Sequence, residues 1–236
     1  NRLPILFLPG DTFANRFPDP VLQQVEHFNN PSLTVNDAYK SVTKYFDRIT
    51  RPEQIISSLE QALQTMLDPA DCGPACISLS QDVQGEQFDY PEDFFKERTH
   101  KIRRSRPDID QINDAVKIIK KSKKPLIISG GGVFYSDAMK QLSDFAIKHN
   151  IPVTHTVMGY SSIKRDHSHF TGVIGGLGSK AANNLAKETD VAIVIGTKLA
   201  DFTTGSWANF ENPNFKLVSI NAARFDANKH MAQAIV

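Results

Sequence analysis

Residues 123–142, KKPLIISGGGVFYSDAMKQL, decide the fold of this chain. A short apolar run leads directly into three consecutive glycines, and a helix-like segment follows. This order is typical of a buried parallel strand that ends in a nucleotide-binding turn. The glycines do not complete the G-x-G-x-x-G pattern, because Ser136 stands where a further glycine could close against the helix. A nucleotide site and a tight turn without a ligand both remain open.

The same alternation continues through the second half of the chain. The pattern predicts helices over 108–122, 136–150 and 175–188, and strands over 125–129, 151–156, 191–196 and 216–221. Alternating strands and helices of this length predict a parallel sheet wound on both faces. We therefore expect an α/β, doubly wound, Rossmann-like domain over residues 108–236.

The first half of the chain contains fewer regular elements. ILFLPG at 5–10 predicts a fully buried parallel strand, and 19–28 allows one short helix. An amphipathic pattern over 51–67, with Thr50 as its cap, predicts a helix that leads into a second buried strand at 75–83.

These elements form the last β-α-β unit of a sheet, of which residues 1–85 supply only about two strands. Two strands are too few to bury both faces of a sheet. We therefore expect this half to be less stable than residues 108–236.

Between the two halves, residues 86–107 are charged and aromatic, which predicts an interdomain linker. Its basic cluster, KIRRSRP at 101–107, fits a nucleic-acid patch or a solvated linker, and we favour the linker. The chain has 27 basic and 26 acidic residues, so its net charge of +1 creates no general attraction for nucleic acid or membranes. No apolar run approaches the roughly 18 residues of a membrane span, and we expect a cytoplasmic protein.

Three short patterns could bind a metal ion. Cys72 and Cys76 fit half of a zinc site or a redox pair, but we expect reduced, partly buried thiols. His167 and His169 lack an evident third ligand. Gly-Asp-Thr at 10–12 resembles a Gly-Asp-Gly metal motif with Asn36 at a suitable distance, but its third residue differs and no helix follows. We predict no metal site in this chain.

Several motifs together resemble a known family. GGG, TVMG at 156–159, GVIGG at 172–176 and IGTKLADFTTG at 195–205 resemble the central domain of the thiamine diphosphate enzymes related to acetolactate synthase and pyruvate oxidase. GPACISLSQDV at 73–83 resembles the end of their pyrimidine-binding domain. RLPILFLPGDTFANRFPDPVLQQVE, YFDRITRPEQ and DFTTGSW are similar to the branch that hydrolyses a cyclic 1,2-diketone in myo-inositol catabolism.

The resemblance implies a fold, a cofactor and a reaction. Residues 1–85 would be the C-terminal part of a pyrimidine-binding domain, and 108–236 the central domain. Thiamine diphosphate and Mg²⁺ would open the diketone ring by C–C cleavage. The family's catalytic glutamate and metal motif are not found here, and Glu26 does not match that glutamate. We expect a piece of a longer, homo-oligomeric enzyme, dimeric or tetrameric, that has no catalytic residue in this chain and is inactive by itself.

The resemblance also assigns two groups of site residues. Gly10, Asp11 and Thr12 would lie near the substrate, although a loop stabilised by Asx-type bonding fits them as well. In flavin-bearing relatives the glycine loops of the central domain hold FAD. The matching residues here are Gly130, Gly131, Gly132, Thr156, Met158, Gly175 and Thr197, with Lys198 in place of an arginine. Lysine lacks the forked geometry of arginine, so we expect an empty, nucleotide-shaped crevice and no FAD.

Two alternatives remain. Another thiamine diphosphate reaction, of the acetolactate synthase or sulfoacetaldehyde acetyltransferase type, would use the same domains. A stand-alone nucleotide-binding or regulatory module is the alternative from a different class.

Overall fold

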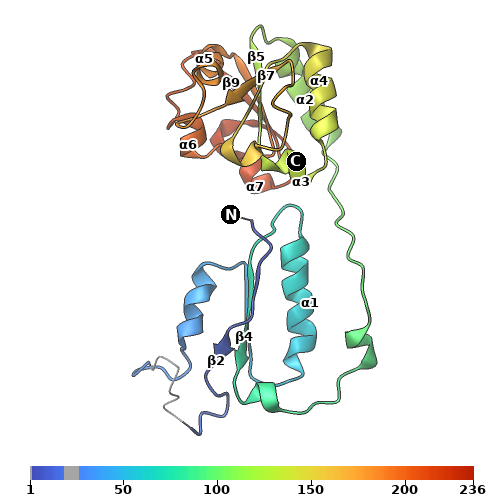
Figure 1. Cartoon of the computed structure of the whole chain (residues 1–236), viewed down its shortest axis with the longest axis vertical. Helices are drawn as coiled ribbons and strands as arrows, with labels where there is room; N and C mark the ends of the chain where they lie inside the picture. The colour runs from blue at the N-terminus through green and yellow to red at the C-terminus, as the bar shows by residue number, and fades with distance from the viewer. Residues whose placement is uncertain (1, 19–26) are drawn as a thin grey trace. The chain divides into compact units, whose positions relative to one another are not determined.

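The computed structural model describes residues 2–18 and 27–236 of the chain (Figure 1). The chain forms two compact units, Asn1–Arg103 and Arg104–Val236, called unit 1 and unit 2 below. Most of the short helix predicted over 19–28 lies outside the described residues.

Unit 2 is built on a six-stranded parallel sheet. Its strands are β5 (Pro125–Ser129), β6 (Val153–His155), β7 (Phe170–Val173), β8 (Val191–Ile195), β9 (Lys216–Ile220) and β10 (Gln233–Ile235). They lie in the order β10-β9-β8-β5-β6-β7. The order runs outward in both directions from the β5–β8 pair, which is the arrangement of a doubly wound dinucleotide-binding sheet. The predicted fold class is confirmed.

Helices cover both faces of this sheet. The longer ones are α2 (Ile109–Lys120), α4 (Met139–His149) and α5 (Lys180–Glu188). Shorter helices lie in the connections: α3 (Gly131–Tyr135) follows β5 and η4 (Val157–Gly159) follows β6. After β8 and β9 come α6 (Asp201–Thr204), α7 (Arg224–Ala227) and η5 (Lys229–Met231). Side chains cap the starts of two of these helices. The Asp108 side chain accepts from the backbone N–H of Asp110 in α2, and the Ser179 side chain accepts from the backbone N–H of Ala182 in α5.

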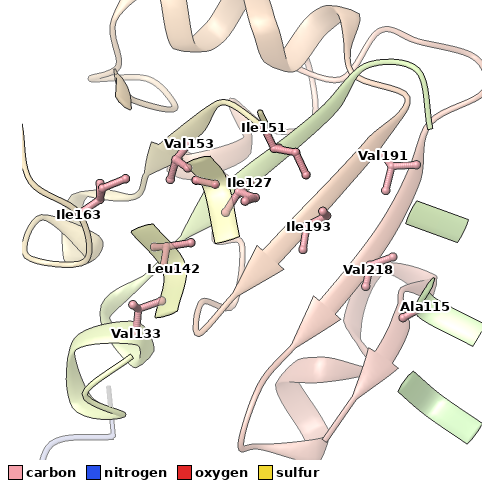
Figure 2. Packing of buried hydrophobic residues seen from close by; sticks show 11 residues of the cluster. Ala115, Ile127, Val133, Leu142, Ile151, Val153, Ile163, Val191, Ile193 and Val218 are labelled. Atoms are coloured by element: carbon pink, nitrogen blue, oxygen red, sulfur yellow. The ribbon is translucent and has the colours of Figure 1, made fainter. Parts of the chain in front are cut away.

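The alternation of side chains along each strand creates two cores. Ile127, Ile193 and Val218 lie side by side on neighbouring strands and pack with residues of α2 and α4 (Figure 2). Leu126 and Val194 point to the other face and pack with α5. Both faces are therefore apolar, as expected for a parallel sheet with helices on each side.

Three features of unit 2 differ from the sequence prediction. β7 (Phe170–Val173) and β10 (Gln233–Ile235) were not predicted. The helix predicted over 136–150 begins earlier, inside the glycines, as α3. The chain then breaks at Asp137, which has a φ of 54°, and resumes as α4.

Unit 1 contains a smaller parallel sheet of four strands. They are β1 (Leu6–Phe7), β2 (Gly10–Asp11), β3 (Tyr45–Ile49) and β4 (Ala75–Ser80). β4 is central, with β1 and β2 along one side and β3 along the other. The estimate of about two strands was therefore too low, since β3 was missed and supplies the first strand of the β-α-β unit.

The described residues of unit 1 between β2 and β4 include the 3₁₀ helix η1 (Val35–Ser41) and the helix α1 (Gln54–Leu67). Ile77 of β4 is fully buried in a cluster with Ala62 of α1 and Ile49 of β3. The alternate residues of β4, Cys76, Ser78 and Ser80, are also buried. This second face is therefore largely polar.

Two predictions about unit 1 were wrong in detail. The strand at 5–10 is parallel but not fully buried, because it borders the sheet, and Leu8 is 55% exposed. Thr50 does not cap α1, whose N-cap position is Glu53. Instead the side-chain Oε1 of Gln54 accepts from the backbone N–H groups of Thr50 and Arg51 at 2.7 and 3.1 Å.

The segment after β4 contains two short 3₁₀ helices, η2 (Val83–Gly85) and η3 (Glu92–Phe95). Tyr90 makes ring contacts with Phe88, Phe94 and Phe95, and its hydroxyl donates to the Pro52 carbonyl at 3.2 Å. These contacts attach the first half of the predicted linker to unit 1. Among the described residues, no helix has the length and apolar character needed to cross a membrane.

Candidate functional site

The carboxyl edge of the unit 2 sheet brings the predicted crevice residues together. The loops after β5 and β8 meet at the point where the strand order reverses, which is where doubly wound sheets bind ligands. The Gly130 N–H donates to the Ile195 carbonyl at 2.8 Å, and the Gly132 N–H donates to the Gly196 carbonyl at 3.0 Å. Two of the three glycine amides are thus used within the protein.

The glycines are required by this close backbone contact. A Cβ on Gly132 would lie 2.6 Å from the Gly196 Cα, and one on Gly130 would lie 2.4 Å from the Gly196 oxygen. Gly196 itself has a φ of +64°. The packing alone therefore explains these glycines, without a ligand.

The loop after β6 lies against the same turn. A Cβ on Gly131 would approach the Met158 carbonyl to 3.0 Å, which places the two loops in contact. The Thr156 hydroxyl is buried and accepts from the Gly159 N–H at 3.1 Å. Met158 points outward and is 75% exposed.

The loops after β7 and β8 form the second part of the crevice. Gly175 has a φ of +106°, and its N–H and carbonyl both bond to the Asn183 side chain. The Thr197 carbonyl accepts from the Asn221 amide at 3.2 Å, and Lys198 is exposed. Sequence reasoning missed Asn183 and Asn221, since their roles depend on loops that meet only in the fold.

Large apolar side chains are exposed in all of these loops. Tyr135, Met158, Leu177, Phe202 and Phe225 are each more than 70% exposed. They follow five successive strands of the sheet, β5 to β9. Exposed apolar groups gathered at one edge are typical of a surface that contacts a ligand or another protein segment.

A hollow of about 460 Å³ lies at the opposite edge of the sheet, at the start of β8 and β9. Its lining includes Lys117, Lys121, Asp190 and Lys216. The Asp190 carboxylate accepts from the backbone N–H groups of Lys123 and Lys124. Asp190 therefore fixes the entry to β5.

In unit 1, the segment called the loop Gly10–Thr12 consists of the two residues of β2 and the residue that follows, and it lies at the carboxyl edge of the sheet beside the end of β4. Asp11 is buried, and its Oδ2 lies 2.6 Å from the Nε of Arg48. The Asp11 Oδ2 also accepts from the Ser78 hydroxyl, and its Oδ1 accepts from the Thr12 N–H at 2.8 Å. The Asp11 carboxylate is therefore fully engaged inside unit 1, whereas Gly10 is exposed.

This network sets the charge of Asp11. Burial raises the pKa of the Asp11 carboxyl, but hydrogen bonds from Ser78, Arg48, Thr34 and Thr12 outweigh it, so the pKa lies below its usual value. Burial likewise acts against the ionised form of Asp37, yet contacts with Lys40, Thr34 and Arg48 hold its pKa well below the usual range. Both carboxylates are ionised at neutral pH.

The side-chain amide nitrogen of Asn36 supports the loop Gly10–Thr12 from inside unit 1. Its side-chain amide donates to the Gly10 carbonyl at 2.7 Å and to the Ser78 hydroxyl at 2.8 Å. The possible metal ligands Asp11 and Asn36 are therefore bound to protein groups. Across residues 2–18 and 27–236, no cluster of three or more metal-ligating side chains occurs.

The remaining candidate ligands are explained by local packing. Cys76 is buried and Cys72 is partly buried, and burial raises the pKa of both thiols. The rings of His167 and His169 are 5.7 Å apart in the loop before β7, and His169 bonds to Asn150.

The sheet order and the helices on both faces define unit 2 as a doubly wound, Rossmann-like α/β domain. A comparison with known families identifies the family of this domain, because residues 112–236 match the thiamine pyrophosphate enzyme central domain. The chain belongs to the thiamine pyrophosphate enzymes.

Curated relatives match over the whole chain. A 3D-(3,5/4)-trihydroxycyclohexane-1,2-dione hydrolase of Clostridium perfringens is 48% identical over 236 residues, which are 100% of this chain and 37% of the relative. The enzyme of the same name from Clostridium tetani is 49% identical, and that from Geobacillus thermodenitrificans is 46% identical, with the same coverage. The chain thus spans about 37% of the length of these relatives.

Proposed function

We propose that this chain is part of a thiamine diphosphate-dependent hydrolase that opens the ring of trihydroxycyclohexane-1,2-dione by C–C cleavage in myo-inositol catabolism. The observation that carries the proposal is the similarity to hydrolases of that name over all 236 residues. The reaction would belong to the longer protein, as a cytoplasmic homodimer or homotetramer, and the 236 residues alone would be inactive.

We also propose a domain assignment. Residues 1–85 would be the C-terminal part of the pyrimidine-binding domain, 86–107 a linker and 108–236 the central domain. The family match over 112–236 supports the last of these.

The residues of this chain do not fit the diphosphate–metal site. The Asp11 carboxylate is paired with Arg48 and the Asn36 amide is bonded within unit 1. The contacts to thiamine diphosphate and Mg²⁺ are therefore assigned to other parts of the longer protein. Titration with both tests this assignment: we expect binding by the full-length protein only, and tight binding by the 236-residue chain would contradict it.

The loop Gly10–Thr12 is proposed as substrate-proximal. Gly10 is exposed, and a Cβ placed on it would meet no atom within 4 Å, so the loop borders open space at the carboxyl end of the sheet. Thr12 is partly exposed, whereas Asp11 supports the loop from inside.

Paired glycine variants test this role in the full-length protein. Gly10→Ala is expected to raise the KM for the diketone without lowering thermal stability, because the methyl group enters free space beside the substrate. Gly85→Ala is the control, since a Cβ there also meets no atom within 4 Å. Equal KM values for the two variants would contradict the role of the loop.

The crevice of unit 2 is proposed to hold no nucleotide. The amides of Gly130 and Gly132 are bonded to the loop after β8, and Lys198 replaces the arginine of flavin-bearing relatives. Titration with FAD and ADP is expected to show no binding, and micromolar affinity for either would overturn the proposal.

Activity assays separate the proposed reaction from its alternatives. The full-length protein, with thiamine diphosphate and Mg²⁺, is expected to hydrolyse the cyclic diketone and to leave pyruvate unchanged. Turnover of pyruvate without turnover of the diketone would instead favour an acetolactate synthase type of reaction.

A further inference from the structure

We propose that Arg48 is a positioning residue, which holds the loop Gly10–Thr12 in its working conformation by joining Asp11 to the segment that begins η1. This inference rests on the proposed function of the loop. Arg48 lies on β3, next to the central strand β4, and is therefore outside the loop that it contacts.

The contacts of Arg48 form a bridge between two segments. Its Nε lies 2.6 Å from the Asp11 Oδ2, and its Nη2 lies 2.6 Å from the Asp37 Oδ2. The Nη2 also donates to the Thr34 hydroxyl at 2.9 Å. One guanidinium therefore ties the end of β2 to the first turn of η1.

Both ends of the loop depend on this bridge. Asp11 holds the Thr12 N–H through its second oxygen, at 2.8 Å. Asn36, which lies in η1 beside Asp37, donates to the Gly10 carbonyl at 2.7 Å. The bonds made by Arg48 therefore fix the two residues that flank Asp11.

The bridge requires arginine rather than only a positive charge. Arg48 uses separate nitrogens of a planar fork for the two carboxylates, whereas a lysine ammonium is a single point on a flexible stem. A lysine at this position keeps the charge that balances the buried Asp11, but it loses the geometry that joins the two segments.

The test uses Arg48→Lys in the full-length protein, with Arg51→Lys as a matched control. Arg51 pairs with Glu53 at 2.7 Å, and its side chain is 74% exposed, so the same exchange there removes no buried bridge. Three quantities are measured for each variant: amide hydrogen exchange in peptides covering residues 8–16, kcat/KM for the substrate that the wild-type protein turns over, and the affinity for thiamine diphosphate.

For Arg48→Lys we expect faster exchange in residues 8–16 and a loss of about tenfold or more in kcat/KM, because small displacements of positioning groups slow catalysis strongly. The affinity for thiamine diphosphate should stay unchanged, and Arg51→Lys should change none of the three values. A purely structural role would leave kcat/KM of the folded variant unchanged.

Two results would overturn the inference: unchanged exchange in the loop of Arg48→Lys, or faster exchange with unchanged kcat/KM. If Arg48→Lys does not fold, Asp11→Asn serves as the second variant, since it keeps the side-chain shape and weakens the same bridge. Failure of the proposed function is distinguishable, because the wild-type protein would then be inactive on the diketone while loop exchange still reports on Arg48.

Discussion

The two units use their sheets in different ways. In unit 2 both faces of the sheet are apolar, with Ile127 and Leu126 pointing in opposite directions into separate cores. In unit 1 one face is apolar around Ile77, while the other carries the buried Asp11 and Ser78. Buried apolar area supplies most of the stability of a fold, whereas a buried ionic network adds little stability over the apolar packing that could replace it, although breaking the network is costly.

This difference separates stability from positioning. Unit 2 gains stability from two cores and presents loops at one edge. Unit 1 gives up apolar burial on one face and gains a defined loop at the end of β2. Unit 1 should therefore be the first part of the protein to open.

Matched core variants give the largest expected effect. Ile127→Ala and Ile77→Ala each remove a side chain that is fully buried on a central strand, at a cost of about 2–5 kcal/mol. We expect unit 2 to remain folded after Ile127→Ala, whereas Ile77→Ala should remove most amide protection from unit 1. Hydrogen exchange of the whole protein, followed separately in the two units, checks this.

Ile147→Ala is the control for both variants, because Ile147 lies on α4 and is 55% exposed. It should change stability by less than about 0.5 kcal/mol. The opposite result would show that unit 1 is the more stable unit. In that case unit 1 would keep its amide protection after Ile77→Ala, and unit 2 would lose its protection after Ile127→Ala.

The next largest effect concerns the glycine turn of unit 2. Gly132→Ala would bring a Cβ to 2.6 Å from the Gly196 Cα, so two backbones must separate, at a cost of about 1–3 kcal/mol. Gly85→Ala should be close to neutral. Thermal unfolding without any nucleotide measures both, and an unchanged midpoint for Gly132→Ala would show that the glycine is not required by packing.

The sequence was sufficient for the elements that follow a single period. The helix over 109–120 and the strand over 125–129 are as expected, because their apolar spacing reflects burial by regular neighbours. β3 was missed since Asp47 and Arg48 interrupt its apolar pattern. Arg48 alternates with Tyr45 and Ile49, which pack in the Ile77 cluster, and therefore lies on the polar face of the sheet.

Some site residues could likewise be predicted from a local pattern in the sequence, whereas others could not. The glycine loops could be located because glycine is required wherever two backbones meet closely. The positioning role of Arg48 was not predicted from the sequence, because its partners Asp11 and Asp37 lie 37 and 11 residues away and reach it only in the folded sheet. A charged residue in a short apolar strand is the signal that could have indicated it.

Acid should affect unit 1 through Asp11 and Asp37. Because the pKa of each carboxyl is lower in the folded state, both groups stabilise unit 1 above the unfolded value of about 4, and this stabilisation is lost as the pH falls through the folded values. Hydrogen exchange after short acid pulses should show unit 1 opening below about pH 4. Asp11→Asn should make this pH dependence shallower, and an unchanged slope would exclude Asp11 as a cause.

The smallest expected effects concern the first residues of the helices α2 and α1. Asp108 caps α2 by accepting from the Asp110 N–H at 2.7 Å, so Asp108→Ala should cost about 1 kcal/mol. Thr50 has the sequence signature of a cap but only a long contact to Gln54, at 3.3 Å, so Thr50→Ala should cost less than about 0.5 kcal/mol. Denaturant unfolding of both variants measures the difference. A larger loss for Thr50→Ala would mean that its hydroxyl, rather than the Gln54 side chain, organises the start of α1.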